Sequence, residues 1–263
     1  MLTSETVRLK SGRTWQVYID GKGPDLLWLH GPRGVAPGDP LLEALAQRHR
    51  IVAPVAPGFN DLAELDAIDN VHELALDYDD LLLGMRLRPL PIVGHSFGAM
   101  IAAELAAHVP ERATKLVLLA PVGLWNEAYP VADLFAVPVG EMDEMLWHDA
   151  AARDAHTARL SRAAAGNDQI EQILALTRNL TALTKFLWPI PDKGLRRRLR
   201  RVAAPSLIIF GAEDAFVPAR YADDFAAGLA QARSIILKGA GHMVPYEKTA
   251  EVAAAIEDFL ATK

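Results

Sequence analysis

The pattern of hydrophobic positions changes early in the chain from alternating to continuous. Between Val7 and Ile19, apolar and polar residues alternate on both sides of the Ser11-Gly12 pair, which predicts a half-buried β-hairpin. The short apolar runs that follow do not alternate and are bounded by Gly or Pro. This pattern is typical of parallel strands that are buried on both faces. It predicts such strands at Leu26–Leu29, Ile51–Val55, Pro91–Val93 and Leu116–Leu119.

Helical spacing fills the intervals between these runs. Apolar residues recur every three or four positions, which is the period of one face of an α-helix. The third of the helices must end at Pro110, because proline cannot continue a helix. The spacing predicts helices at 41–45, 71–85 and 99–108. Strands that alternate with helices in this way favour a doubly wound α/β fold.

The alternation of strands and helices stops at Pro121 and resumes after Arg201. Within this interval, helical spacing is present at Met142–Arg153, Asp168–Lys185 and Gly194–Arg201, and no strand is predicted. Strand patterns return at Leu207–Phe210 and Ser234–Leu237, with closing helices at Ala219–Leu229 and Thr249–Leu260. We therefore predict an α/β core at residues 1–120 and 202–263, with a mostly parallel eight-stranded sheet. An all-helical cap at residues 121–201 is predicted to be inserted after the sixth strand.

Composition narrows the class of protein further. The chain has 263 residues, of which 51% are hydrophobic, and a formal net charge of -6. This acidic balance argues against nucleic acid as a partner. The first ten residues lack the apolar core of a signal peptide, and the most apolar stretch, Leu116–Trp125, is too short to span a bilayer. We expect a cytoplasmic monomer or homodimer that acts on a small molecule without contact with a membrane. The absence of cysteine excludes disulfides and a thiolate nucleophile.

The segment Gly94-His95-Ser96-Phe97-Gly98 has the G-x-S-x-G pattern of a nucleophile elbow. A predicted strand precedes it and a predicted helix follows it, which is the context that the motif requires. The sharp turn holds the serine in a strained backbone conformation, and glycine on either side avoids a clash. Ser96 is therefore the candidate nucleophile, at the N-terminus of a helix whose dipole favours developing negative charge.

A serine hydroxyl becomes a good nucleophile only when a base removes its proton and a carboxylate orients that base. Asp214 follows the strand predicted at Leu207–Phe210, and His242 follows the one at Ser234–Leu237. All three residues thus lie at the carboxyl ends of parallel strands, where such sheets place their ligand sites. Glu213 competes with Asp214 for the carboxylate role.

These motifs together resemble the α/β-hydrolase superfamily. The resemblance rests on His30-Gly31, the elbow, the stretch from Gly211 to Pro218 and Gly239-Ala240-Gly241-His242, and it covers the chain apart from the cap. It implies a serine hydrolase with a Ser96–His242–Asp214 triad, an acyl-enzyme intermediate and no cofactor. It also implies an oxyanion hole of two backbone N–H groups, one of them from Phe97. The second usual position holds Pro32, which has no N–H. The second donor is therefore expected at Arg33 or Gly34, unless a side chain supplies it or it is absent.

The cap is predicted to roof a hydrophobic substrate pocket, since it carries many large apolar residues. The leading hypothesis is hydrolysis of small hydrophobic or aromatic carboxylic esters. Cleavage of a carbon–carbon bond in a vinylogous diketone and lactone hydrolysis remain alternatives, and so does a non-catalytic ligand-binding receptor on the same fold. The predicted pocket residues are His30, Trp125, Phe135, Trp147, Trp188 and Met243.

Two other groups of residues are interpreted as structural. The remaining histidines, which include His72 and His108, show no metal-ligand spacing, so no metal site is predicted. The basic run Lys193–Arg201 is interpreted as a solvated helix face beside acidic neighbours rather than as an anion site.

Overall fold

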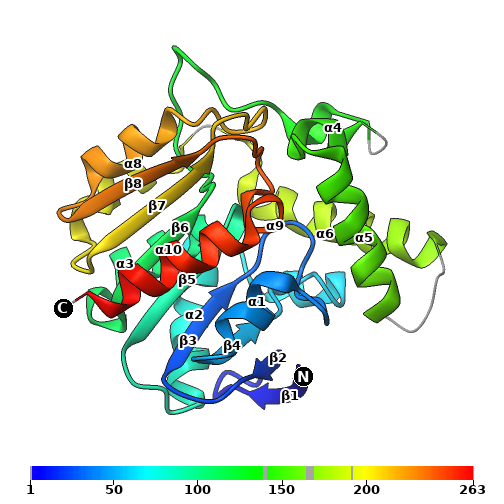
Figure 1. Cartoon of the computed structure of the whole chain (residues 1–263). Coiled ribbons are helices and arrows are strands. Elements are labelled where there is room, and N and C mark those ends of the chain that lie inside the picture. Colours follow the sequence, from blue (N-terminus) through cyan, green and yellow to red (C-terminus); the bar gives the residue numbers. More distant parts are fainter. Residues whose placement is uncertain (1, 139–140, 164–168, 191, 263) are drawn as a thin grey trace.

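The computed structural model of the chain describes residues 2–138, 141–163, 169–190 and 192–262. Its centre is an eight-stranded sheet with the strand order β1-β2-β4-β3-β5-β6-β7-β8 (Figure 1). β1 pairs antiparallel with β2 and β2 pairs antiparallel with β4, while all the other neighbours are parallel. The strands are β1 Thr3–Arg8, β2 Thr14–Asp20, β3 Asp25–Leu29, β4 Arg50–Pro54, β5 Leu90–His95, β6 Ala113–Leu119, β7 Ser206–Gly211 and β8 Ala232–Leu237.

The predicted doubly wound, mostly parallel sheet is confirmed. β3, β5, β6 and β7 are almost completely buried because helices cover both faces of the sheet. α1 and α10 pack together on one face, and α2, α3 and α8 lie on the other (Figure 1). These helices are α1 Pro40–Leu45, α2 Val71–Gly84, α3 Phe97–His108, α8 Tyr221–Gly228 and α10 Thr249–Ala261, and α9 Val244–Glu247 directly precedes α10.

Helices occupy the interval between β6 and β7, as the pattern predicted, and no strand occurs among its described residues. They are α4 Met142–Leu146, α5 Ala150–Ala163, α6 Gln169–Leu187 and α7 Leu195–Arg198. Short 3₁₀ helices complete the fold at η1 Leu62–Ala67, η2 Pro110–Arg112, η3 Leu134–Ala136 and η4 Leu199–Arg201. The domain limits at residues 120/121 and 201/202 stay predictions. The last part of the predicted cap, α7 and η4, packs against α3 and α8 of the core.

One predicted helix, Met142–Arg153, is wrong, because the segment forms two helices with a break at Trp147. Trp147 is extended, and the Asp149 carboxylate accepts hydrogen bonds from the N–H groups of Ala151 and Ala152, which starts a new helix. The Leu146 carbonyl accepts a hydrogen bond from the Met243 N–H at 3.0 Å. The break thus joins the cap to the loop that carries His242. The predicted start of the next helix, at Asp168, lies outside the described residues.

No helix among the described residues is both long enough and apolar enough to cross a membrane.

Candidate active site

Ser96 stands at the junction of β5 and α3, in a backbone conformation that side chains rarely adopt. Its φ is 54° and its ψ is -114°, and its N–H donates to the Leu119 carbonyl of β6. A β-carbon at Gly94 would lie 2.5 Å from the Gly98 carbonyl oxygen, and one at Gly98 would lie 2.0 Å from the Leu29 carbonyl oxygen. Glycine at both positions is therefore what allows the turn to close, as the elbow pattern predicted.

Asp214 and Glu213 follow β7, and their carboxylates point to different partners. Asp214 is buried, and its Oδ1 accepts hydrogen bonds from the N–H groups of Phe216 and Val217 at 2.9 and 2.8 Å. Its Oδ2 lies 2.8 Å from Nδ1 of His242. Glu213 instead accepts hydrogen bonds from the N–H groups of Gly239 and Ala240. The geometry thus separates the two candidates, because the Asp214 carboxylate lies at the imidazole of His242, whereas the Glu213 carboxylate binds the loop that leads to it.

His242 connects the carboxylate to the serine. Its ring is fully buried, with Nδ1 at Asp214 and Nε2 2.8 Å from Oγ of Ser96. Its loop is held on both sides, because the Gly241 N–H donates to Oε2 of Glu247 and the Met243 N–H donates to Leu146 of the cap. Three residues that lie far apart in the sequence therefore form one hydrogen-bonded chain at the carboxyl ends of β5, β7 and β8. This is the arrangement that general-base activation of a serine requires.

Two further histidines hold this arrangement in place as neutral rings. Burial lowers the pKa of His95 to about 3, with a smaller effect from the neighbouring His242. Its Nε2–H donates to the backbone carbonyl of His242 at 3.0 Å. Burial also lowers the pKa of His30 to about 4. His30 Nδ1–H donates to the Gly31 carbonyl, and its Nε2 accepts from the Ala56 N–H. His30 therefore braces the His-Gly loop, and neither ring carries charge at neutral pH.

The His-Gly loop makes a tight turn beside the elbow. The Gly34 N–H donates to the Gly31 carbonyl at 3.2 Å, so this N–H already has an acceptor. The Pro32 carbonyl accepts a hydrogen bond from Nδ2 of Asn179 on α6. The Arg33 side chain forms an ion pair with Asp143 of α4. Two cap helices thus fix the loop, and of the two predicted second donors only Arg33 has an N–H outside this turn hydrogen bond.

An apolar pocket borders the hydrogen-bonded chain. The ring of Phe216, which lines it, meets the His242 ring edge-on with centroids 4.8 Å apart. Phe186, which also lines it, stacks on Phe97 at 5.8 Å. The lining is apolar except for the charged residues Glu104 and Lys193. The other lining residues are Val71, Met100, Val122, Gly123, Leu124, Val131, Leu134, Phe135, Leu187, Ile190 and Leu195.

Of the side chains predicted to line a substrate pocket, Phe135 lines this one. Trp147 is buried against Tyr246, with ring centroids 6.3 Å apart, and Met243 is buried beside His242. Trp125 bonds to Glu127 through its indole N–H, and Trp188 is 51% exposed. His30 does not line this pocket either. The contact of these five residues with substrate stays a prediction.

The basic run Lys193–Arg201 does more than face solvent. Nε and Nη2 of Arg198 donate to the two oxygens of Glu104, both at 2.7 Å, and Glu104 is only 1% exposed. Arg196 pairs with Asp224, and Arg201 donates to the Ala107 carbonyl. The predicted acidic neighbours are thus present, as Glu104 and Asp224, and Arg201 is exposed. Only Arg198 departs from the interpretation as a solvated face, because it pairs with a buried carboxylate. Glu104 is a charged residue in an otherwise apolar part of α3, and this sequence signal indicates that its carboxylate needs a charged partner.

The chain belongs to the alpha/beta hydrolase family. A model of that family matches residues 26–255, from within β3 to within α10, which includes all three residues of the hydrogen-bonded chain. The protein is accordingly a hydrolase.

Known relatives cover most of the chain. A pimeloyl-[acyl-carrier protein] methyl ester esterase from Nitrosomonas europaea is 31% identical over 84% of this chain and 90% of its own length. A 2-hydroxy-6-oxo-6-phenylhexa-2,4-dienoate hydrolase from Comamonas testosteroni is 27% identical over 91% of this chain and 88% of its own. Among solved structures, a bacterial membrane phospholipase A superposes with a TM-score of 0.80 at 21% identity, covering 98% of this chain and 86% of that one. The last similarity concerns the fold alone.

Proposed function

We propose that this chain is a serine esterase that uses Ser96 as nucleophile, His242 as general base and Asp214 as the group that orients the base. The observation that carries the proposal is the continuous hydrogen-bonded chain from Asp214 through His242 to Oγ of Ser96, with 2.8 Å at each step. The strained backbone at Ser96 supports it, because such strain persists where the surrounding structure enforces it for function.

The geometry supports a two-step mechanism. Oγ of Ser96 attacks the ester carbonyl carbon while its proton passes to Nε2 of His242. Asp214 stabilises the imidazolium that forms, since it accepts the hydrogen bond from Nδ1. The imidazolium then protonates the leaving alcohol as the carbon–oxygen bond breaks. Water activated by the same histidine hydrolyses the acyl-enzyme and restores Ser96.

The backbone N–H groups of Phe97 and Arg33 form the oxyanion hole in this proposal. Phe97 begins α3, so its N–H is one of the four that a helix leaves without an intrahelical acceptor. The N–H of Gly34 is bonded to the Gly31 carbonyl, and Pro32 has none, which leaves Arg33 in the loop. The ion pair between Arg33 and Asp143 then connects the residue that carries this donor directly to the cap.

Removing the Arg33 N–H is expected to slow the chemical step. Arg33→Pro should lower kcat by about 10²–10³-fold relative to Arg33→Ala, because both variants lose the ion pair and only the first loses the backbone donor. Steady-state kinetics of both variants with one ester measures the effect, and thermal unfolding checks that both are folded. Equal kcat values for the two folded variants would exclude Arg33 as a donor.

The apolar lining of the pocket supports an uncharged, hydrophobic acyl or alcohol group in the substrate. The relative from Nitrosomonas europaea is named as a methyl ester esterase, which agrees with ester chemistry. The relative from Comamonas testosteroni is named as a hydrolase of a 6-oxo-dienoate, which keeps carbon–carbon bond cleavage as the second candidate. Against the latter, residues 95 and 243 hold His and Met, where enzymes of that group usually carry Asn and Trp.

A substrate panel distinguishes these activities. We expect turnover of p-nitrophenyl butyrate and p-nitrophenyl benzoate, with kcat/KM at least about tenfold above that for a γ-lactone or a vinylogous diketone. One additional contact in a hydrophobic pocket changes kcat/KM by roughly this factor. Release of p-nitrophenol and loss of the diketone absorbance provide the two readouts. Preferential cleavage of the diketone would replace the esterase assignment by the carbon–carbon hydrolase, and tight binding without turnover of any member would favour a receptor.

The predicted cytoplasmic location and the monomeric or homodimeric state stay predictions.

A further inference from the structure

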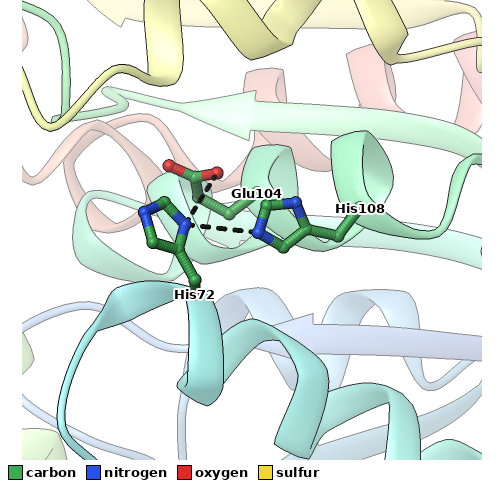
Figure 2. Close-up of side chains that lie close together, drawn as sticks. All are labelled: His72, Glu104 and His108. Carbon is green, nitrogen blue, oxygen red and sulfur yellow. Dashed lines mark hydrogen bonds and ion pairs between the residues drawn. The ribbon is translucent and has the colours of Figure 1, made fainter.

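His72, Glu104 and His108 form a cluster of possible metal ligands outside the triad. Nε2 of His108 lies 3.2 Å from Nδ1 of His72, and Nδ1 of His72 lies 4.0 Å from Oε2 of Glu104. All three ligand atoms lie within 4.8 Å of one another (Figure 2). The spacing of the histidines along the sequence gave no sign of this cluster, because it depends on the packing of α2 against α3.

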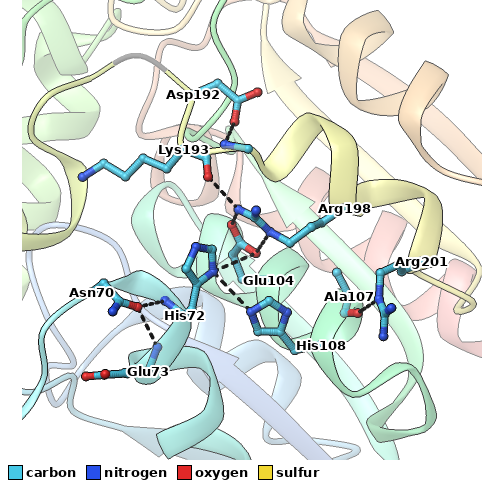
Figure 3. A network of polar contacts seen from close by, with 11 residues as sticks. Asn70, His72, Glu73, Glu104, Ala107, His108, Asp192, Lys193, Arg198 and Arg201 are labelled. Carbon is cyan, nitrogen blue, oxygen red and sulfur yellow. Dashed lines mark hydrogen bonds and ion pairs between the residues drawn. The ribbon is translucent and has the colours of Figure 1, made fainter.

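The two helices bring the ligands together from opposite sides. Glu104 and His108 are four residues apart on α3 and therefore share one face of that helix. His72 comes from the first turn of α2, after the N-cap residue Asn70 (Figures 2 and 3). Glu104 is almost completely buried, whereas the His72 side chain is 39% exposed. An ion could reach this cluster from the solvent side and keep a water molecule as a fourth ligand.

The ligand set and its spacing suit zinc. Two imidazoles and one carboxylate are ligands that zinc takes in proteins, at about 2.0–2.2 Å and with tetrahedral geometry. Those bond lengths imply roughly 3.4 Å between ligand atoms, so the two imidazole nitrogens are already close to the required separation. The Glu104 oxygen has to approach by about 1 Å.

Arg198 both supports and limits the site. It donates to both oxygens of Glu104, and its Nη2 also donates to the Lys193 carbonyl (Figure 3). A hydrogen bond of this kind orients a ligating carboxylate in the way that outer groups do in known metal sites. Its positive charge, together with that of Arg201 close by, opposes the approach of a cation. We therefore expect binding that is weaker than in structural zinc sites.

We propose that His72, Glu104 and His108 bind one zinc ion, which joins α2 to α3. Glu104 also lines the apolar pocket, and α3 begins directly after Ser96. Bound zinc would therefore fix one wall of the pocket. The site does not depend on the proposed esterase activity, since none of its ligands belongs to the triad.

Metal titration of the chelator-treated, full-length protein tests the proposal. Calorimetry with ZnCl₂ should give one equivalent bound with a Kd in the micromolar range, and Co²⁺ should give the visible absorption of a tetrahedral site. His72→Gln and His108→Gln should each weaken zinc binding at least about tenfold and remove the Co²⁺ band. His148→Gln, a change at an exposed cap histidine, should leave both readouts unchanged.

His72→Gln changes a partly exposed side chain, so this variant should fold normally, and thermal unfolding without metal confirms it. A protein that binds no zinc would overturn the proposal. So would a folded His72→Gln variant that keeps the affinity and the Co²⁺ band of the wild type, because the ion would then be held elsewhere.

Discussion

Ser96→Ala is expected to lower kcat for ester hydrolysis by about 10⁵–10⁶-fold while the protein stays folded. The variant removes the oxygen that attacks the carbonyl, and among the described residues no other hydroxyl forms a hydrogen bond with the His242 ring. Only the oxyanion hole and substrate binding remain, and these alone give limited catalysis. The measurement is kcat with p-nitrophenyl butyrate at saturating substrate.

Ser206→Ala provides the matched control for this loss. Ser206 is also a buried serine, at the start of β7, but its hydroxyl donates to the Ala204 carbonyl rather than to a base. Its replacement should change kcat by less than about threefold. A Ser96→Ala protein that keeps more than about a hundredth of the wild-type rate would place the nucleophile elsewhere.

Asp214→Asn should cost about 10⁴-fold in kcat, because an amide holds the imidazole in the wrong tautomer and cannot stabilise the imidazolium. Glu213→Gln is the natural comparison, since the two carboxylates are adjacent in sequence. Glu213 accepts hydrogen bonds only from loop N–H groups, and a glutamine oxygen can still accept them. We expect less than about tenfold loss there. The pair of kcat values decides which carboxylate serves His242, and a larger loss in Glu213→Gln would reverse the assignment.

The sheet could be predicted from the sequence because its strands are buried on both faces. Short continuous runs such as Leu116–Leu119, with Pro121 soon after it, are typical of such strands. The nucleophile-elbow pattern and the candidates Ser96, Asp214 and His242 could be identified from the sequence for a related reason. Each of these residues follows its own strand. The position after a strand could not distinguish Glu213 from Asp214, because both residues follow β7. They differ in the direction in which their side chains point.

Features that arise from packing between distant segments were out of reach of the sequence. The contact of the break at Trp147 with the loop of His242 joins segments about a hundred residues apart, whereas the Asp149 cap that starts the second helix is a local signal. The pocket combines residues from α3, the cap and the segment after β7, so bulky cap residues alone gave a poor guide to its lining. The His72–Glu104–His108 cluster has the same origin, since two packed helices supply its ligands.

The central claim is that Ser96 is an activated nucleophile, and covalent labelling tests it most directly. Wild type and Ser96→Ala are treated with a fluorophosphonate, intact masses are recorded and the modified peptide is mapped. The account predicts one adduct on wild type, located at Ser96, and none on the variant. An unlabelled wild-type protein, or an adduct that persists in Ser96→Ala, would contradict it.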